Sequence, residues 1–206
     1  AATSHDATRY YETMPADKID LALQLEADRM TNSIYSEKEV ASERTVIISE
    51  REGHENEPMF RLGETVQQTA FRVHPYHHEI IGDMADLHTI SRDDLYEHYR
   101  KYYVPNNAVL AIAGDFETKS MLKRIKELFG SIPKGSTPSR LARSEPEPKG
   151  EVRLSIEGPG ETTCIQVAYH FPNATHPDYI PLQVLDSLLG GASGLSYKTS
   201  RLYRAL

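Results

Sequence analysis

Residues 36–51, SEKEVASERTVIISER, are the stretch of this chain whose fold the sequence constrains most strongly. Ser36 followed three residues later by Glu39 has the pattern of a capping box, in which each side chain bonds a backbone amide at the start of a helix. We therefore expect a helix to begin at Ser36. Along it, Val40 and Ile47 recur two turns apart and mark an apolar stripe that must pack against another element.

Two glutamates on this helix, Glu43 and Glu50, are seven residues apart, so they lie about 20° apart around the helix axis. Both lie within about 40–80° of the apolar stripe, so we expect the carboxylates to flank the buried side of the helix rather than to face solvent. Burying a carboxylate is costly unless a cation, a hydrogen-bond network or a metal compensates. From spacing alone, the alternative is a pair of surface glutamates neutralised by Arg44 and Arg51.

The run SERTVIISE at residues 42–50 resembles the helix that follows the active-site motif in the pitrilysin/insulinase family of zinc peptidases. In that family the later glutamate is the third zinc ligand. The earlier one does not touch the metal but supports this ligand from the surrounding layer of side chains. The resemblance therefore implies that Glu50 binds Zn²⁺ and that Glu43 supports the site.

Other segments resemble the family in the family's own order along the chain. The opening residues, AATSHDATRYY, resemble an edge strand that pairs with the backbone of a bound peptide. The resemblance thus implies a substrate-binding role for Ala1, Ala2, Thr3 and Ser4. Further resembling segments are 74–76 with 81–82, 102–108 with 113–115, and 129–133.

The family's metal-binding motif is missing from this sequence. The family holds its metal through H-x-x-E-H, upstream of the third ligand, and none of the nine histidines completes that pattern. In the family the motif precedes the edge strand, and an arginine/tyrosine pair that helps hold substrate lies beyond the position of Leu206. We therefore expect an internal fragment of a zinc metalloendopeptidase, which alone neither hydrolyses peptides nor binds zinc tightly.

Two alternatives remain from the sequence. The first is a non-catalytic family partner or substrate-binding subunit, and the second is an unrelated α+β binding domain with chance matches. The family resemblance further implies a peptide or small-protein substrate, the remainder of the same chain as a partner, and a homo- or hetero-dimer with another peptidase-family subunit. Because we expect the start to be internal, the first residues carry no prediction of the compartment.

The composition of the chain excludes several kinds of partner and metal site. A net charge of −7 without a lysine/arginine cluster argues against nucleic acid or an anionic membrane as the main partner. The single cysteine, Cys164, excludes an internal disulfide and thiolate zinc patterns. Its apolar neighbours predict that it is buried. The histidines of the H-x-x-H-H cluster at 74–78 are expected in a loop, which lacks the rigid frame of a zinc site.

The pattern of the chain predicts an α+β fold, with a layered antiparallel sheet and helices. We expect helices over 16–33, from 36 to about 53, and over 58–71, 91–103, 119–129 and 177–189, with a further short helix from about residue 197. We expect strands over 9–14, 108–113, 151–157 and 162–171. Residues 134–150, rich in proline, serine and mixed charge, are the expected linker. The resemblance then implies most of a zinc-binding peptidase domain over 1–133 and the opening part of a second, catalytically silent one over 151–206.

Overall fold

The computed structural model describes residues 1–139, 143–158, 161–190 and 200–205. The chain divides into two compact units, Ala1–Cys164 and Ile165–Leu206, and each is described by itself. The expected linker falls inside the first unit, and its residues 140–142 lie outside the described part. The remainder of 134–150 forms neither helix nor strand. The helix expected to start near residue 197 also begins outside the described residues.

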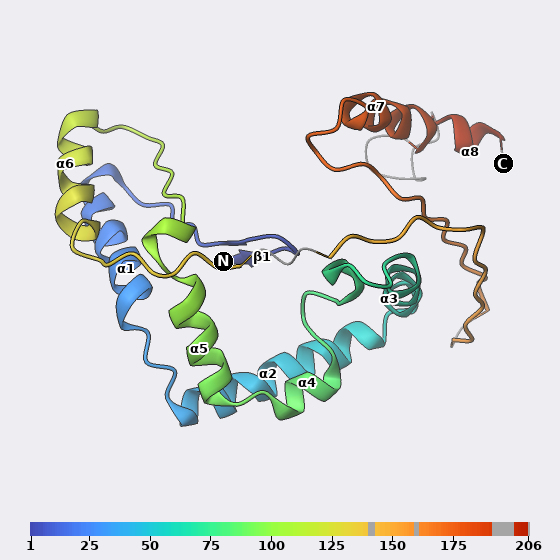
Figure 1. The fold of residues 1–206 in the computed structure, drawn as a ribbon, viewed down its shortest axis with the longest axis horizontal. Coiled ribbons are helices and arrows are strands. Elements are labelled where there is room, and N and C mark those ends of the chain that lie inside the picture. Colours follow the sequence, from blue (N-terminus) through green and yellow to red (C-terminus); the bar gives the residue numbers. More distant parts are fainter. Residues whose placement is uncertain (140–142, 159–160, 191–199, 206) are drawn as a thin grey trace. The chain divides into compact units, whose positions relative to one another are not determined.

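The first unit is mostly helical (Figure 1). It opens with a hairpin in which β1 (Ala2–Thr3) pairs antiparallel with β2 (Thr8–Arg9), in the register Ala2↔Arg9 and Thr3↔Thr8. Its helices, in chain order, are η1 (Ala16–Lys18), α1 (Ile19–Asn32), α2 (Glu37–Glu55), α3 (Pro58–Ala70), η2 (Pro75–His77), α4 (Met84–Thr89), α5 (Arg92–Tyr102), η3 (Pro105–Asn107) and α6 (Thr118–Phe129).

Local capping explains where several helices begin. The Ser36 side chain accepts a hydrogen bond from the amide of Glu39 at the start of α2, as predicted. A complete capping box joins Ser91 to Asp94 at the start of α5. Pro58 occupies the first turn of α3, where its missing N–H costs nothing. These signals involve residues three positions apart or fewer, so the sequence alone reveals them.

Tyr99 is the most deeply buried large side chain among the described residues, at 1% exposed, and it joins α5 to α1. Its hydroxyl donates to the carbonyl oxygen of Arg29 (2.8 Å) and accepts from the backbone N–H of Ser33 (3.2 Å). Its ring lies against the rings of Tyr35 and Tyr103, at centroid distances of 5.4 and 5.2 Å. An ion pair between Arg124 on α6 and Asp20 on α1 extends the same helical layer.

The connection between α1 and α2 contains Tyr35 in the left-handed region, with φ of 54°. A non-glycine residue adopts this conformation only where the surroundings hold it. Arg92 supplies that restraint, because its guanidinium donates to the carbonyl oxygens of Tyr35 (2.8 Å) and Ile34 (2.7 Å). The turn into α2 is therefore set by a side chain from α5.

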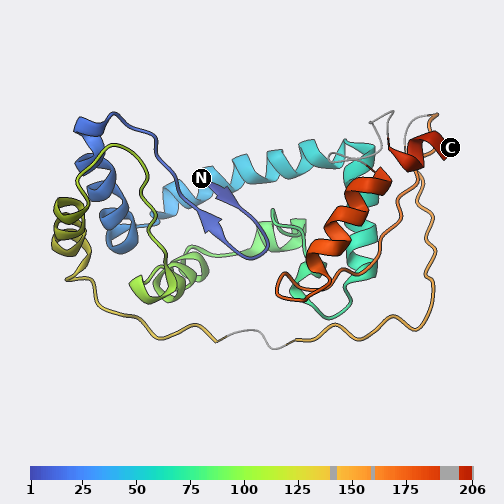
Figure 2. The ribbon, with the colours of Figure 1, turned by 90° about the horizontal axis from the view of Figure 1, so that it is seen from above.

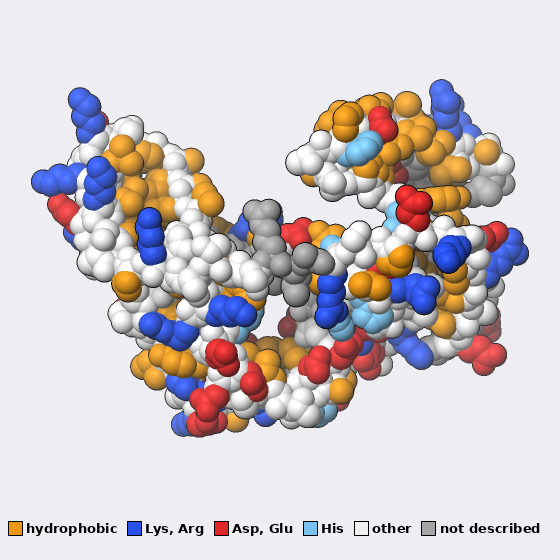
Figure 3. Space-filling model, in the orientation of Figure 1, with side chains coloured by type: hydrophobic (Ala, Val, Ile, Leu, Met, Phe, Trp, Pro, Cys, Tyr) orange, Lys and Arg blue, Asp and Glu red, His pale blue; other side chains and the backbone are white. Residues whose placement is uncertain are grey.

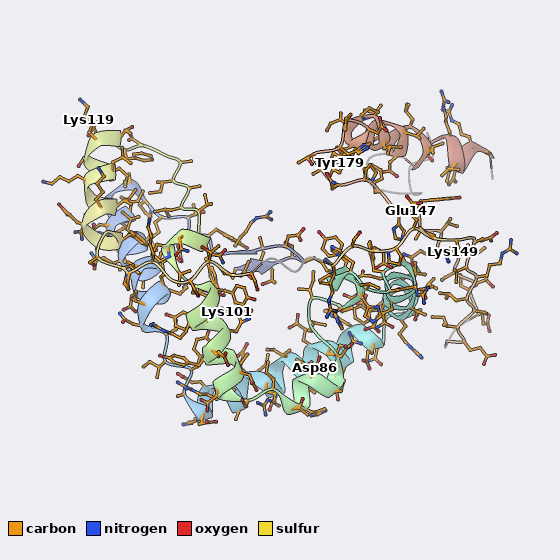
Figure 4. All side chains as sticks on the ribbon, viewed as in Figure 1. Asp86, Lys101, Lys119, Glu147, Lys149 and Tyr179 are labelled. Carbon is orange, nitrogen blue, oxygen red and sulfur yellow. The ribbon has the colours of Figure 1, made fainter. Side chains whose placement is uncertain are left out.

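Helix α2 packs against α4 and α3 (Figure 2). Its buried residues are Val40 and Arg51, eleven positions apart and therefore about 20° apart around the axis. Asp86, labelled in Figure 4, lies on α4 where that helix runs beside α2. The histidine cluster at 74–78, expected in a loop, contains the short helix η2, and α4 follows it.

Among the described residues, none of the segments 108–113, 151–157 and 162–171 forms a strand, although their sequences favour strands. A strand needs a neighbour to satisfy its backbone N–H and C=O groups. Apolar side chains in these segments are correspondingly exposed, Val109 by 96% and Ile165 by 81%. The mixture of helices and sheet is confirmed, while the described sheet is one antiparallel pair. Cys164 is exposed, so the prediction of its burial is wrong, because none of the elements that the structure describes covers its segment.

The second unit contains α7 (Tyr179–Gly190) and α8 (Arg201–Ala205). Apolar side chains of α7, among them Ile180, Val184 and Leu188, are more than half exposed, and Figure 3 shows apolar side chains gathered on this helix. Among the described residues, no helix combines the length and apolar character that crossing a membrane requires.

Candidate functional site

Helix α2 carries both candidate carboxylates, and both Glu43 and Glu50 are exposed. The expectation that they would be shielded is therefore wrong. The buried stripe of α2 centres on Val40 and Arg51, and the glutamates lie about 60–100° around the axis from these two residues. The helices that cover the stripe leave the flanking positions open. Glu43 and Glu50 still share one side of the helix, as their spacing requires.

Arg44 and Arg51, the expected neutralising partners, are engaged elsewhere. The guanidinium of Arg44 donates to the carbonyl oxygen of Ile90, which lies just after α4. Arg51 bonds Glu55 and Glu64. Within the part of the chain that the structure describes, neither Glu43 nor Glu50 has a hydrogen bond or an ion pair.

Arg51 is 5% exposed and holds α2 against α3. Its Nε donates to Glu55 (2.9 Å), its Nη2 donates to Glu64 on α3 (2.6 Å), and its guanidinium lies 5.0 Å from the ring centroid of Phe60. Burial alone lowers the pKa of Arg51, but the hydrogen bonds that Arg51 donates to the two carboxylates outweigh this effect and raise that pKa. The side chain therefore stays charged and fixes the rotation of α2.

The candidate peptide-pairing residues lie on the N-terminal hairpin. Ala1, Ala2, Thr3 and Ser4 are all exposed, and the β1–β2 pair is the whole of the sheet among the described residues. The outer edge of β1 therefore has no strand beside it in the described structure. Backbone groups on such an edge are able to pair with an extended peptide.

The turn of this hairpin rests on the segment after α3. The Tyr76 hydroxyl donates to Asp6 (2.6 Å), and the ring centroids of Tyr76 and His5 are 5.0 Å apart. Gln67 on α3 donates to the carbonyl oxygen of Tyr76 (2.7 Å) and its side-chain nitrogen lies 3.0 Å from Nε2 of His5. The sequence pattern did not indicate the contacts of His5 and Asp6 with this segment, which join residues more than 60 positions apart.

The three histidines of the cluster at 74–78 have structural partners. His74 Nδ1 accepts from the backbone N–H of Tyr76 (3.2 Å), and His77 Nδ1 lies 2.8 Å from the carbonyl oxygen of Phe71. His78 lies 3.5 Å from Asp83. Across the described residues, no group of three or more histidine, cysteine, aspartate and glutamate side chains is arranged to hold a metal ion.

Comparison with known proteins places the chain in a family of peptidases. A family model described as "Insulinase (Peptidase family M16)" matches residues 1–84, and one described as "Peptidase M16 inactive domain" matches residues 89–206. The chain belongs to the insulinase family of peptidases, family M16. The sequence-based resemblance is thereby confirmed.

Comparison with individual proteins gives the same family. The chain is 29% identical to the zinc protease PqqE of Helicobacter pylori and 28% identical to a probable mitochondrial-processing peptidase subunit beta of Arabidopsis thaliana, in each case over 92% of its own length. A crystal structure of a protease from Helicobacter pylori matches 93% of the chain with a TM-score of 0.73 and 25% identity. The chain spans 44%, 36% and 46% of these three proteins, respectively.

Proposed function

We propose that this chain forms part of a zinc-dependent metalloendopeptidase, to which it contributes Glu50 as the third zinc ligand. Glu43 supports that ligand, and Ala1, Ala2, Thr3 and Ser4 pair with the substrate backbone. The family matches support this proposal, because zinc proteases are among the relatives by name. Both glutamates lie on one side of α2 and are exposed, so further chain outside this sequence is able to reach them.

The metal itself does not fit the described residues of this chain alone. These residues supply no group of three candidate ligands. In the proposed site, Glu50 is therefore a single ligand, and the two histidines belong to an H-x-x-E-H segment outside this sequence. We accordingly assign to this chain one zinc ligand, one supporting carboxylate and a strand that pairs with peptide. We assign no step of hydrolysis to it.

The domain arrangement is part of the proposal. Residues 1–133 supply most of the zinc-binding domain, 134–150 are the linker, and 151–206 open a second, catalytically silent domain. The absence of helix or strand in the described part of the linker supports this division. The family model described as inactive begins at residue 89, so it includes residues 89–133 as well as the second domain. The exposed apolar side chains of 151–157 and 162–171 suit strands of a layered sheet completed by further chain.

A second candidate function is a non-catalytic partner or substrate-binding subunit. The match of residues 89–206 to the model described as inactive favours it. One relative is by name a subunit of a processing peptidase, which supports pairing with a second peptidase-family subunit. The two candidates differ in one respect, because only the first uses Glu50 to bind zinc.

Zinc titration distinguishes them. We expect the 206-residue chain alone to bind zinc weakly in calorimetry, and the chain assembled with an H-x-x-E-H segment to bind about one zinc tightly, as three protein ligands allow. Tight binding by the chain alone contradicts the assignment of a single ligand. Absence of zinc from a folded assembly supports the non-catalytic subunit.

A further inference from the structure

Glu145, in the segment expected as a linker, is bound by the loop that follows α3. Its carboxylate accepts hydrogen bonds from three successive backbone N–H groups, those of Arg72 (2.9 Å), Val73 (2.8 Å) and His74 (2.8 Å). Successive N–H groups that converge in this way form a nest, which suits an anion. Hydrogen bonds to an ionised acceptor are about twice as strong as neutral ones.

This contact is specific to one glutamate of the segment. Glu145 is half-buried, whereas Glu147, two residues further on and labelled in Figure 4, is exposed. Glu147 has the same side chain in the same stretch, without a contact to the nest. It is therefore a matched control for the effect of charge alone.

The loop that holds Glu145 also holds the N-terminal hairpin. Beyond the nest, His74 accepts from the N–H of Tyr76, and the ring centroids of these two residues are 4.3 Å apart. Tyr76 in turn donates to Asp6 in the hairpin turn and contacts the ring of His5. A continuous series of contacts thus runs from Glu145 to the turn between β1 and β2.

We propose that Glu145 is a positioning residue whose carboxylate, bound by the amides of 72–74, fixes the loop and through Tyr76 the β1–β2 hairpin. The linker thereby sets the position of the strand that we assign to substrate pairing. That last consequence rests on the proposed function, whereas the mechanical link between Glu145 and the hairpin does not.

Hydrogen exchange on the full chain tests the link. In Glu145→Ala we expect the amides of 72–74 to exchange about 10- to 100-fold faster, the size expected from losing charge-assisted bonds. The amides of Tyr76 and Ser4, which bond His74 and Ala7, should follow with a smaller increase. Glu145→Gln, which keeps an acceptor but loses the charge, should fall between Glu145→Ala and the unchanged protein.

Glu147→Gln should leave all these exchange rates unchanged. The proposal is overturned if Glu147→Gln has the same effect as Glu145→Gln, or if the 72–74 amides respond while Ser4 and Tyr76 do not. It is also overturned if exchange rises equally at α5 and α6, since that pattern reports general unfolding.

Binding of an extended peptide, measured by fluorescence anisotropy, separates this inference from the proposed function. Weaker binding to Glu145→Ala with unchanged binding to Glu147→Gln supports both. An exchange response in the hairpin without peptide binding to any of the proteins supports the positioning role of Glu145 and overturns the pairing role of β1.

Discussion

Arg51 donates a hydrogen bond to Glu64 across 2.6 Å, and this bond between two mostly buried side chains joins α2 to α3. It also determines where Glu50 lies. Consecutive residues of a helix are rotated by about 100°, so turning Arg51 inward turns its neighbour Glu50 toward the solvent. The exposure of the proposed zinc ligand is thus a direct consequence of how α2 packs.

Removing the charge of Arg51 should destabilise the chain. Arg51→Met keeps the apolar stem but leaves Glu64 without its partner, so we expect a loss of about 2–4 kcal/mol in the free energy of unfolding, near the range for broken buried pairs. Urea denaturation measures it. Lys38→Met, at an exposed position of the same helix, should change stability by less than about 0.5 kcal/mol. If the two substitutions changed the free energy of unfolding equally, Arg51 would not be what holds α2 against α3.

The Tyr99 hydroxyl should contribute to stability through its two backbone partners. Tyr99→Phe keeps the ring but leaves the Ser33 N–H without its partner and removes one of two hydrogen bonds to the Arg29 carbonyl, which also accepts from the Ser33 hydroxyl; we expect a cost of about 1–3 kcal/mol. Tyr11→Phe is the control, because Tyr11 is 69% exposed. Thermal unfolding of both variants compares them. An unchanged melting temperature for Tyr99→Phe would contradict the role of these hydrogen bonds.

Two helix caps should make stability depend on acidic pH. Hydrogen bonds from the Ser91 side chain and backbone lower the pKa of Asp94, and the backbone N–H groups of Lys119 and Ser120 lower the pKa of Glu117. Carboxyls with pKa values lowered by folding stabilise the folded state above their ordinary pKa of about 4, and this stabilisation is lost as the pH falls through the lowered values.

The double variant Asp94→Asn/Glu117→Gln tests this dependence. Its free energy of unfolding should change less steeply with pH below about pH 4 than that of the unchanged chain, because the two titrating groups are gone. Circular dichroism across a pH series gives the slope. Identical slopes for the two proteins would show that the caps do not titrate in this way.

The sequence predicted those features whose causes are local. The cap at Ser36 and the helix starts near residues 58 and 91 were predicted correctly, because each depends on residues within one turn. The family was also recognised from short segments in order. Contacts between distant segments left no local pattern, so the contacts of Glu145 with residues 72–74 could not be predicted.

The orientation of the two glutamates shows the same limit. Helical spacing placed Glu43 and Glu50 correctly on one side of α2, but their burial depends on which helices cover that side. The predicted strands were wrong for a related reason. Alternating apolar and polar residues indicate the two faces of a strand, but they do not show whether a neighbouring strand is present to pair with it. Long-range packing decides both outcomes.

Replacement of Glu50 should leave the fold of the chain intact. Glu50→Gln changes an exposed side chain without a partner among the described residues, so we expect a shift in unfolding free energy of less than about 0.5 kcal/mol. Urea denaturation of the chain measures it. A loss above about 1 kcal/mol would indicate a structural role for this carboxylate rather than the one proposed.

Zinc content of the assembled protein tests the proposed role of Glu50 most directly. The chain is assembled with a segment that carries H-x-x-E-H, and bound zinc is measured by inductively coupled plasma mass spectrometry after gel filtration. We expect about one zinc per assembly for the unchanged chain and for Glu52→Ala, an exposed neighbour on α2, and a large loss for Glu50→Ala. Full retention of zinc by a folded Glu50→Ala assembly would contradict the assignment of Glu50 as a ligand.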